Sequence, residues 1–311
     1  MKKVLILGVN GFVGGYLVEE LKRNNYIIYG ADMRYKLNEK LDKFYRINIL
    51  DINEIQDVIE KVVPDYIINL VAISSVKKSW DNPQLTFDIN VKGTINLLET
   101  VRKLNLNCRI LLVGSSEEYG EIDYSKPVNE MSKLNSINPY GISKITQERI
   151  ARMYVDAYNM DIIMTRSFNH IGAGQSKGFV IPDFVSQIVQ IEKGKIEPII
   201  RVGNLSAERD FTDVRDVVKA YILLIEKGIS GESYNVGSGK VVSIQHVLDI
   251  LLNISKVKIE VEIDKIKFRQ VETPKIQCDI NKIKKCVNWI PKISLEETLS
   301  EVLNFERKNS N

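Results

Sequence analysis

The chain is poor in cysteine, and this scarcity excludes several classes of protein. Only Cys108, Cys278 and Cys286 occur among 311 residues, and no two of them form a C-x-x-C pair. An odd number of dispersed cysteines argues against a disulfide framework and against a zinc site, and it favours a reducing compartment such as the cytoplasm. We therefore expect a cytoplasmic protein without a bound metal.

The net charge is small, and long apolar runs are absent from the sequence. The formal net charge is +3, and no basic stripe with interleaved aromatic residues occurs, so we expect no nucleic-acid partner. No apolar run approaches the roughly 18 residues of a membrane span, and the first apolar run is not followed by a signal-peptide cleavage pattern. With 44% hydrophobic and 27% charged residues, the composition is that of an ordinary globular protein of one or two domains.

A glycine-rich turn follows the first apolar run. Residues 4–7 are typical of a buried strand, and residues 12–23 carry apolar side chains at helical spacing. Glycines between a strand and a helix let the backbone bend sharply and let a pyrophosphate approach the N–H groups at the helix start. The spacing is G-x-x-G-x-x-G, one residue longer at its first step than the usual dinucleotide fingerprint, and a purely structural turn is the alternative. The predicted cofactor contacts in this turn are Gly8, Asn10, Gly11, Phe12, Val13 and Gly14.

The second predicted strand, residues 26–31, ends in an acidic residue. Asp32 can accept a hydrogen bond from the 2′-hydroxyl of an adenosine ribose, which favours NAD. Arg34 keeps NADP open, because a guanidinium at this place can bind a 2′-phosphate.

Strands and helices then alternate. Strands are expected near residues 44–47, 66–71 and 110–113, with helices at 53–62 and 83–104, which predicts a Rossmann-type α/β fold with a doubly wound parallel sheet. Ligands bind such sheets beyond the carboxyl ends of the strands. The residues at those ends that we expect to contact a cofactor are Asn48, Ile49, Leu70, Val71 and Ala72. Ser115 and Ser116, after the strand at 110–113, are the hydroxyls nearest to a substrate oxygen, unless they merely cap the chain.

The stretch N-P-Y-G-I-S-K carries the candidate acid–base chemistry. Pro139 suits the first turn of a helix, on which Tyr140 and Lys144 lie four residues apart on one face. A nearby cation favours the phenolate and lowers the pKa of a tyrosine, which suits it to handle the proton of a carbonyl or an alcohol. Since tyrosine and lysine are common here, the pair gains its weight only from the other motifs.

Taken together, the motifs resemble the extended short-chain dehydrogenase/reductase family and its nucleotide-sugar enzymes. The resemblance rests on G-x-x-G-x-x-G, S-S-E-E-Y-G and Y-G-I-S-K, in that order. It implies that Tyr140 is the general acid or base, that Lys144 lowers its pKa and holds the nicotinamide ribose, and that Ser115 binds the reacting sugar oxygen. It also implies an NAD(P) cofactor and a homodimer formed by the helix after Pro83 and the helix carrying Tyr140.

The second half of the chain resembles the substrate-binding part of that family. Residues 166–174, R-S-F-N-H-I-G-A-G, match its R-x-F-N-x-x-G-P-G signature except at Ala173. The resemblance implies that backbone around Phe168 covers the nicotinamide and that Asn169 reaches the substrate diphosphate. His170 is expected to be a hydrogen-bonding fixture rather than a catalytic base. The other residues implied to bind the nucleotide sugar are Ser116, Glu117, Arg209, Arg269 and Glu272.

The same resemblance divides the chain into two parts. Residues 1–167, with about 214–236, would form the NAD(P)-binding domain, and residues 168–213 and 237–311 would form the nucleotide-sugar-binding domain. Further helices are expected from Pro182 and at 214–225, 243–252 and 295–305, and further strands from Asp161 and at 232–236 and 258–263.

Within the family, the motifs look most like those of GDP-4-keto-6-deoxy-D-mannose reductases. The segments G-F-V-I-P-D-F and E-P-I-I-R-V-G-N-L-S-A-E-R-D-F-T-D-V-R-D-V carry this likeness, which implies reduction of a C4 ketone to give GDP-D-rhamnose. A 4,6-dehydratase with Glu117 as its base, or a 4-epimerase, is the alternative, although dehydratases carry Thr where this chain has Ser115. A non-catalytic dinucleotide sensor or scaffold is the alternative of another class.

Overall fold

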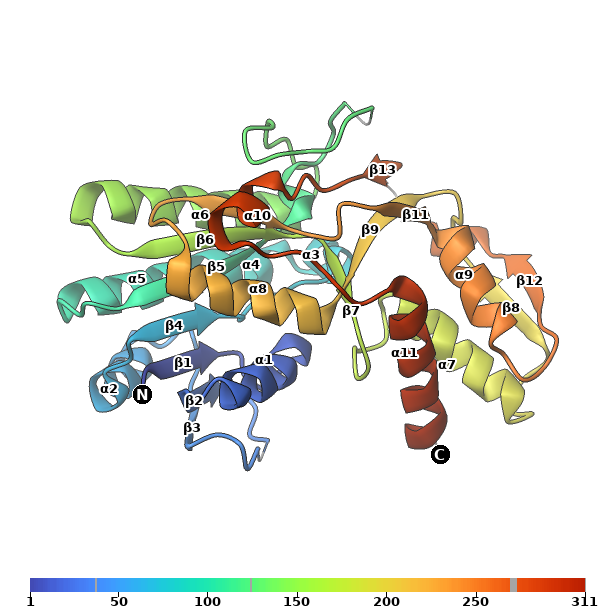
Figure 1. Cartoon of the computed structure of the whole chain (residues 1–311), viewed down its shortest axis with the longest axis horizontal. Helices are drawn as coiled ribbons and strands as arrows, with labels where there is room; N and C mark the ends of the chain where they lie inside the picture. The colour runs from blue at the N-terminus through green and yellow to red at the C-terminus, as the bar shows by residue number, and fades with distance from the viewer. Residues whose placement is uncertain (37, 124, 269–272, 311) are drawn as a thin grey trace.

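A parallel sheet of seven strands forms the centre of the larger part of the molecule (Figure 1). This computed structural model describes residues 1–36, 38–123, 125–268 and 273–310. The strand order is β10-β6-β5-β4-β1-β2-β3, so the direction of winding reverses between β1 and β4. The strands are β1 (Lys3–Leu7), β2 (Ile27–Asp32), β3 (Lys43–Arg46), β4 (Tyr66–Asn69), β5 (Arg109–Ser115), β6 (Ile162–Ser167) and β10 (Ser233–Val236). The predicted Rossmann-type fold is confirmed.

Helices cover both faces of this sheet, as the continuous apolar strands require. Alternate side chains of β1 show the reason: Val4 and Ile6 pack into one buried cluster, and Leu5 and Leu7 pack into another on the opposite face. The first face is covered by α1 (Phe12–Arg23), α8 (Val214–Lys227) and α10 (Asn281–Val287). The second face is covered by α2 (Ile52–Val62), α5 (Gly93–Lys103) and α6 (Pro139–Tyr158).

The helix expected at residues 83–104 is interrupted. It consists of α4 (Pro83–Phe87), the π-helical segment η1 (Asp88–Lys92) and α5, and the unpredicted helix α3 (Val76–Asp81) precedes it. Asn90 lies in the π-helical segment, where its side-chain oxygen accepts from the Ile73 N–H at 2.8 Å and its amide donates to the Ser143 hydroxyl at 2.9 Å. Contacts with two distant segments therefore accompany the distortion, and local periodicity does not reveal them.

A smaller region lies beside the carboxyl end of the sheet (Figure 1). It contains a sheet in which β9 (Glu208–Asp213) pairs with β7 (Asn169–Ile171), β11 (Val241–Ser243) and β13 (Lys275–Ile276). A separate parallel pair is formed by β8 (Ile199–Val202) and β12 (Glu260–Ile263). Around one buried cluster pack α7 (Val180–Glu192), α9 (Ile244–Asn253) and α11 (Leu295–Asn309). Two short 3₁₀ turns complete the set, η2 (Ser116–Glu118) and η3 (Lys265–Lys267).

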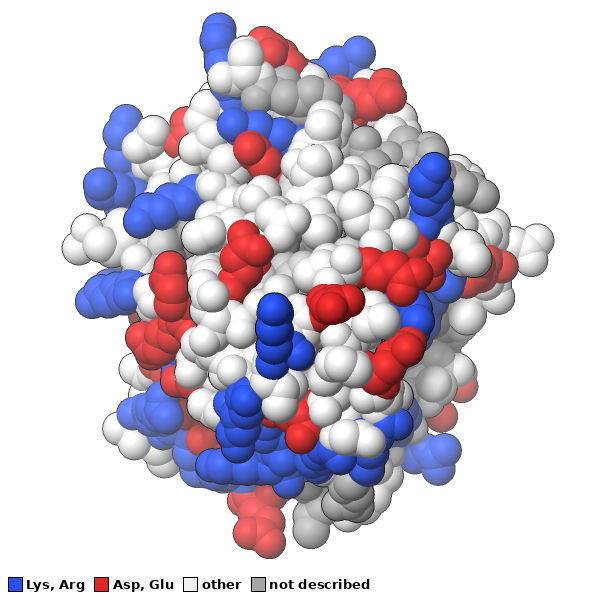
Figure 2. Space-filling model, turned by 90° about the vertical axis from the view of Figure 1, so that its right-hand side faces the viewer, with Lys and Arg blue, Asp and Glu red and all other residues white. Residues whose placement is uncertain are grey.

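The outer end of the smaller region carries charges of both signs. Figure 2 shows acidic and basic side chains interspersed over this face, with Lys and Arg gathered along its lower edge. In the part of the chain that the structure describes, no helix is long and apolar enough to cross a bilayer.

Candidate active site

The start of α6 places the tyrosine and the lysine side by side at the carboxyl end of the sheet. Asn138 is the N-cap, and its side-chain oxygen accepts from the Gly141 N–H at 2.8 Å, while Pro139 occupies the first turn. Tyr140 and Lys144 are both buried, with 8% and 3% of their surface exposed. The predicted geometry of a phenol and an ammonium on one helix face is therefore present.

Ser115, the last residue of β5, meets the phenol from the opposite side. Its hydroxyl is close enough to the Tyr140 phenol to lower the pKa of that phenol. The Ser115 hydroxyl also accepts from the Glu117 N–H at 3.2 Å, and its own N–H donates to the Glu118 carboxyl at 2.7 Å. The structure thus brings Ser115, Tyr140 and Lys144 together at the end of one strand.

Burial controls the protonation of the two acid–base groups. Burial raises the pKa of the Tyr140 phenol above its ordinary value, and the nearby Ser115 hydroxyl opposes this shift. Burial also lowers the pKa of Lys144 to about 8, against the attraction of Glu118. The sequence predicts a lowered pKa of Tyr140 from the nearby Lys144, but in the protein by itself the pKa is raised, because burial and the nearby carboxyl groups of Glu117 and Glu118 act in the same direction. The phenol is held in its protonated form at neutral pH.

The ammonium of Lys144 is held at the end of β5. It donates to the Val113 carbonyl at 2.8 Å and to the Gln147 side-chain oxygen at 3.0 Å. These bonds point the lysine at the strand end that also carries Ser115. An ammonium has three N–H donors, so these two bonds leave one for a ligand.

The glycine turn packs tightly against the protein backbone at two positions. Gly8 has a φ of +80°, and a Cβ there would stand 3.0 Å from the Val71 nitrogen. A Cβ on Gly14 would stand 2.1 Å from the Val9 carbonyl oxygen. No side chain of the described residues caps the amino end of α1, so its N–H groups and its dipole can receive an anion. The turn also lies directly against residues 70–71, as expected for two walls of one cofactor cleft.

Asp32 lies beside this turn and is tied to it. Its two carboxylate oxygens accept from the Asn10 N–H at 3.1 Å and from the Arg34 N–H at 2.9 Å. The exposed Arg34 guanidinium approaches the same carboxylate at 3.8 Å. An open hollow of about 340 Å³ adjoins the turn, and its walls include Asn10, Gly11 and the side chains of Lys36 and Lys40. Asn10, Asp32 and Arg34 are therefore together at the place where an adenosine ribose is expected.

The other predicted cofactor residues differ in how far their side chains are exposed to a ligand. Ile49 is buried against Gly93, so its side chain faces the core, whereas Asn48 is exposed. Val13, Leu70, Val71 and Ala72 are partly exposed around the turn. The Phe168 side chain is buried in a cluster with Tyr119 and Cys278, so only the backbone of Phe168 is placed to meet a ligand.

The aromatic residues at the start of α1 and after β6 pack on each other. Phe12 stacks on His170, with ring centroids 6.3 Å apart and nearly parallel planes. The His170 Nδ1 forms a hydrogen bond with the Phe168 carbonyl at 3.1 Å, and burial lowers the pKa of this imidazole. His170 thus links the two segments, as expected of a hydrogen-bonding fixture.

The predicted substrate residues fall into three groups. Asn169 and Arg209 share one face of the β7–β9 sheet, because Asn169 pairs with Phe211 and Arg209 is two residues before Phe211 on β9. Ser116 is buried, and the partly exposed Glu117 accepts from the Asn138 amide at 2.9 Å. Arg269 and Glu272 lie outside the described residues.

Three residues that the sequence analysis did not select support the site. The Ser79 hydroxyl accepts from the Tyr140 N–H at 3.2 Å, and Asn90 fixes Ile73 and Ser143 as described above. Asn138 bonds both Gly141 and Glu117. Of these, only Asn138 had a visible signal, because an Asn directly before a Pro marks a helix start.

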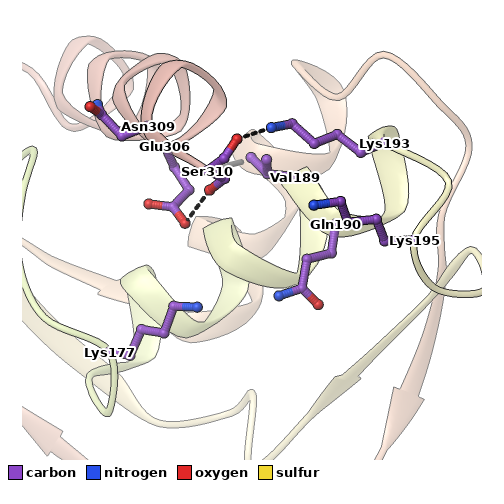
Figure 3. Close-up of a pocket in the computed structure, with 8 residues that line it drawn as sticks. All are labelled: Lys177, Val189, Gln190, Lys193, Lys195, Glu306, Asn309 and Ser310. Carbon is purple, nitrogen blue, oxygen red and sulfur yellow. Dashed lines mark hydrogen bonds between the residues drawn. The ribbon is translucent and has the colours of Figure 1, made fainter.

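A second hollow, of about 310 Å³, lies between α7 and α11 and is separate from the groups above (Figure 3). Lys177, Lys193 and Lys195 line it together with Glu306. Lys193 donates to the Ser310 carbonyl, and the Ser310 hydroxyl donates to Glu306 at 2.6 Å. Its walls contain none of the predicted catalytic or cofactor residues.

Comparisons with known proteins agree with this geometry. The family model described as GDP-mannose 4,6 dehydratase matches residues 5–302. GDP-6-deoxy-D-mannose reductase of Pseudomonas aeruginosa is 28% identical over 304 residues, which cover 97% of this chain and 96% of that protein. A putative UDP-glucose 4-epimerase of Methanocaldococcus jannaschii is 30% identical over 99% of each chain. Among solved structures, RMD from Pseudomonas aeruginosa complexed with NADPH has a TM-score of 0.89 at 26% identity and covers 99% of each chain.

The family match and the fold therefore agree along nearly the whole length. Relatives of this kind are reductases, epimerases and dehydratases of nucleotide sugars. The chain belongs to the GDP-mannose 4,6-dehydratase family of the extended short-chain dehydrogenases/reductases.

Proposed function

We propose that the protein is an NAD(P)H-dependent 4-keto reductase that converts GDP-4-keto-6-deoxy-D-mannose to GDP-D-rhamnose. The observation that carries the proposal is the meeting of Ser115, Tyr140 and Lys144 at the end of β5, on the same edge of the parallel sheet as the glycine turn after β1. The likeness to the Pseudomonas aeruginosa reductase supports the choice of reaction and of GDP as the nucleotide.

Gly8 and Gly14 keep the turn tight against the protein backbone, and the N–H groups at the start of α1, which no side chain of the described residues caps, suit the pyrophosphate of a dinucleotide. The reduced nicotinamide, when bound, supplies the hydride for the ketone carbon. NAD is favoured by Asp32, and Arg34 keeps NADP open, while the similar Pseudomonas aeruginosa structure contains NADPH.

The protein's own part of the reaction is to give a proton to the C4 oxygen. A reduction needs a protonated acid, and burial keeps the Tyr140 phenol protonated at neutral pH. The Ser115 hydroxyl, close to this phenol, is placed to hydrogen-bond the same C4 oxygen as charge develops on it. Lys144 adds a buried positive charge that stabilises the phenolate left after the proton transfer.

The substrate is held on the side of the smaller region. Asn169 and Arg209 share a sheet face, and an Arg fork matches a diphosphate bidentately. With Arg269 and Glu272, they form the proposed nucleotide-binding set, while Ser116 and Glu117 face the sugar. In this proposal residues 1–167 and about 214–236 bind the cofactor, and residues 168–213 and 237–311 bind the nucleotide sugar.

A cytoplasmic homodimer completes the proposal. Its interface would use α4 and α6, where large apolar side chains are exposed: Leu85, Ile142, Met153 and Tyr158.

One observation favours a second candidate, the 4,6-dehydratase. Glu117 stands next to Ser115 and Tyr140, and the Asn138 amide holds its carboxylate at 2.9 Å, a suitable place for a base that removes a proton from the sugar ring. A 4-epimerase would use the same tyrosine and serine, and a dinucleotide sensor would need none of the three catalytic groups.

One set of incubations separates these functions. With GDP-4-keto-6-deoxy-D-mannose and NADH or NADPH, we expect loss of reduced-nicotinamide absorbance equal to the GDP-D-rhamnose formed. Conversion of GDP-mannose without consumption of cofactor would show the dehydratase instead, and interconversion of C4 epimers would show an epimerase. Dinucleotide binding with no turnover of any of these sugars would leave the sensor.

A further inference from the structure

Glu118 is a fully buried carboxyl group next to the proposed catalytic serine. It ends the 3₁₀ turn η2, and one of its oxygens accepts from the Ser115 N–H at 2.7 Å. Gly114 makes room for it, because a Cβ at Gly114 would stand 2.4 Å from this oxygen and 2.3 Å from the Thr165 carbonyl. The sequence around the strand end is therefore arranged to admit a carboxyl group.

The second oxygen of Glu118, Oε2, is buried and has no hydrogen-bond partner among the described residues. The nearest guanidinium, that of Arg166 on β6, is 3.9 Å away. Its donors go elsewhere: two bond Glu148 on α6, at 2.9 and 2.7 Å, and others bond the Tyr119 hydroxyl and the Glu130 carbonyl. Arg166 is thus committed mainly to Glu148.

Lys144 is the second cation near this carboxyl. Its ammonium donates to the Val113 carbonyl, and the Glu118 carboxyl accepts from the Ser115 N–H, so the two side chains hold the backbone on either side of Gly114. The ionisable groups that face Glu118 are Tyr140, Lys144 and Glu148 from α6 and Arg166 from β6. Of these, Lys144 is the cation without a carboxylate partner of its own.

This inference rests on the proposed function. We propose that Glu118 is a positioning residue that fixes the Ser115 backbone, and that its carboxylate stabilises the charged form of Lys144 in alkaline solution.

The protonation of the two groups supports this role. Burial, and then repulsion from Glu148, raises the pKa of Glu118 to about 8, while burial lowers the pKa of Lys144 to about 8. At neutral pH Glu118 is mainly a neutral acid, which suits an oxygen with no hydrogen-bond donor. As the pH rises, Glu118 ionises in the range where Lys144 would lose its proton, and the new negative charge opposes that loss. Removing the charge should therefore lower the pKa of Lys144.

The direct test follows the charge of Lys144 and needs no substrate. Lysine side chains labelled with ¹³C and ¹⁵N are titrated by NMR in the full-length protein, and the Lys144 signal is assigned by its loss in Lys144→Met. In Glu118→Gln we expect the Lys144 midpoint to fall by on the order of one pH unit. The matched control is Glu121→Gln, which changes an exposed carboxyl three residues away and should leave the midpoint in place. An unchanged or higher Lys144 midpoint in Glu118→Gln overturns the proposal that the Glu118 carboxylate stabilises the charged form of Lys144.

Steady-state turnover tests whether Glu118 positions the Ser115 backbone. Glu118→Leu removes the acceptor of the Ser115 N–H, so kcat should fall about three- to tenfold with little change in KM, whereas Glu118→Gln keeps an acceptor and should lose less at neutral pH. The alkaline limb of the kcat profile should move to lower pH in Glu118→Gln. Equal kcat values in wild type and Glu118→Leu would overturn the positioning role.

A third variant covers the case in which these do not fold. Glu118→Asp keeps a carboxylate but is one methylene too short to reach Ser115. It should keep a Lys144 midpoint near that of the wild type and lose kcat, and a midpoint as low as expected for Glu118→Gln would contradict the proposal. If the wild type turns over none of the sugars tested, the proposed function fails while the NMR titration still decides the role of Glu118.

Discussion

The large sheet and the smaller region place the side chains that we propose to be functional in different ways. On the sheet side, three groups lie at strand ends: the glycine turn after β1, Asp32 at the end of β2 and Ser115 at the end of β5, while Tyr140 and Lys144 lie at the start of α6. In the smaller region, Arg209 lies on β9, whose partners β7, β11 and β13 come from three distant parts of the chain. The cofactor side therefore depends mainly on strand ends and the turns after them, whereas the proposed substrate binding depends on long-range assembly of a sheet.

A buried carboxylate shows how the smaller region is assembled. Asp210, next to Arg209, accepts from the Ser238 N–H at 2.6 Å, the Gly239 N–H at 2.8 Å and the Cys278 N–H at 3.2 Å. One side chain thus fastens the segments after β10 and β13 to β9. The position of Arg209 is expected to respond to changes in any of these segments.

The largest expected effect is on the chemistry of the sheet side. Tyr140→Phe removes the proton donor and should lower kcat about 10³-fold or more, while dinucleotide affinity stays within a few-fold. Tyr158→Phe, an exposed tyrosine on the same helix, is the control and should have the wild-type rate. Steady-state kinetics and nicotinamide fluorescence measure the two quantities. A normal rate in Tyr140→Phe would remove this residue from the mechanism.

A smaller effect is expected from Arg209 in the smaller region, and it should appear as weaker binding of the nucleotide sugar. Arg209→Ala removes charge-assisted hydrogen bonds to a diphosphate and should raise KM about ten- to a hundredfold, with kcat less affected. Arg201→Ala, on β8 and paired with Glu197 and Glu262, is the matched control. If Arg209→Ala lowers kcat as strongly as it raises KM, the separation of chemistry from substrate grip does not hold.

A change of several-fold is expected in cofactor choice, again on the sheet side. Asp32→Ala removes an acceptor for the ribose 2′-hydroxyl and should weaken NAD binding while NADP binding stays or improves. Arg34→Ala should do the reverse and weaken NADP alone. Titration calorimetry with both dinucleotides measures this, with Asp57→Ala on α2 as control. Equal losses for both cofactors in both variants would show that neither residue discriminates.

The smallest effect is expected in the pH dependence of stability. The folded-state pKa of Glu118, about 8, is above its ordinary value of 4.5, so its contribution is complete below 4.5 and is lost as the pH rises through 8. For Asp210 the corresponding window runs from 3.8 to about 6. Between pH 6 and 8 the thermal midpoint of the wild type should therefore fall more steeply than that of Glu118→Gln. Differential scanning calorimetry measures these midpoints. If they fall equally steeply with pH in the wild type and in Glu118→Gln, the raised pKa of Glu118 is contradicted.

The sequence predicts the sheet well because its signals are local. The strands β1, β2, β4 and β5 are continuous apolar runs, since both faces of the sheet are covered. The interruption at Asn90 was missed because its partners, Ile73 and Ser143, are distant in the sequence. The strands β7, β11 and β13 are two or three residues long, and a pattern with a period of two cannot be recognised over that length.

In the candidate site too, the sequence predicts the residues with local signals and misses those that depend on three-dimensional packing. Residue type and spacing suggest Tyr140, Lys144 and the two serines Ser115 and Ser116, and the family resemblance singles out Ser115. The structure places Ser115, Tyr140 and Lys144 at the end of β5. Glu117 and Glu118 are adjacent and chemically identical. Glu117 is partly exposed and accepts a hydrogen bond from Asn138, whereas Glu118 is fully buried. The short 3₁₀ turn after β5 decides this difference, and two consecutive acidic residues are ordinarily expected on a solvated surface.

The strand β10 has a consequence for how this protein can be altered. It pairs with β6 at the rim of the large sheet, although the chain reaches it only after passing through β7, α7, β8 and β9. A graft of the whole smaller region from a relative would need several junctions and would disturb the outermost strand. New sugar preferences are therefore more accessible through replacements within individual loops than through transplantation of an intact module.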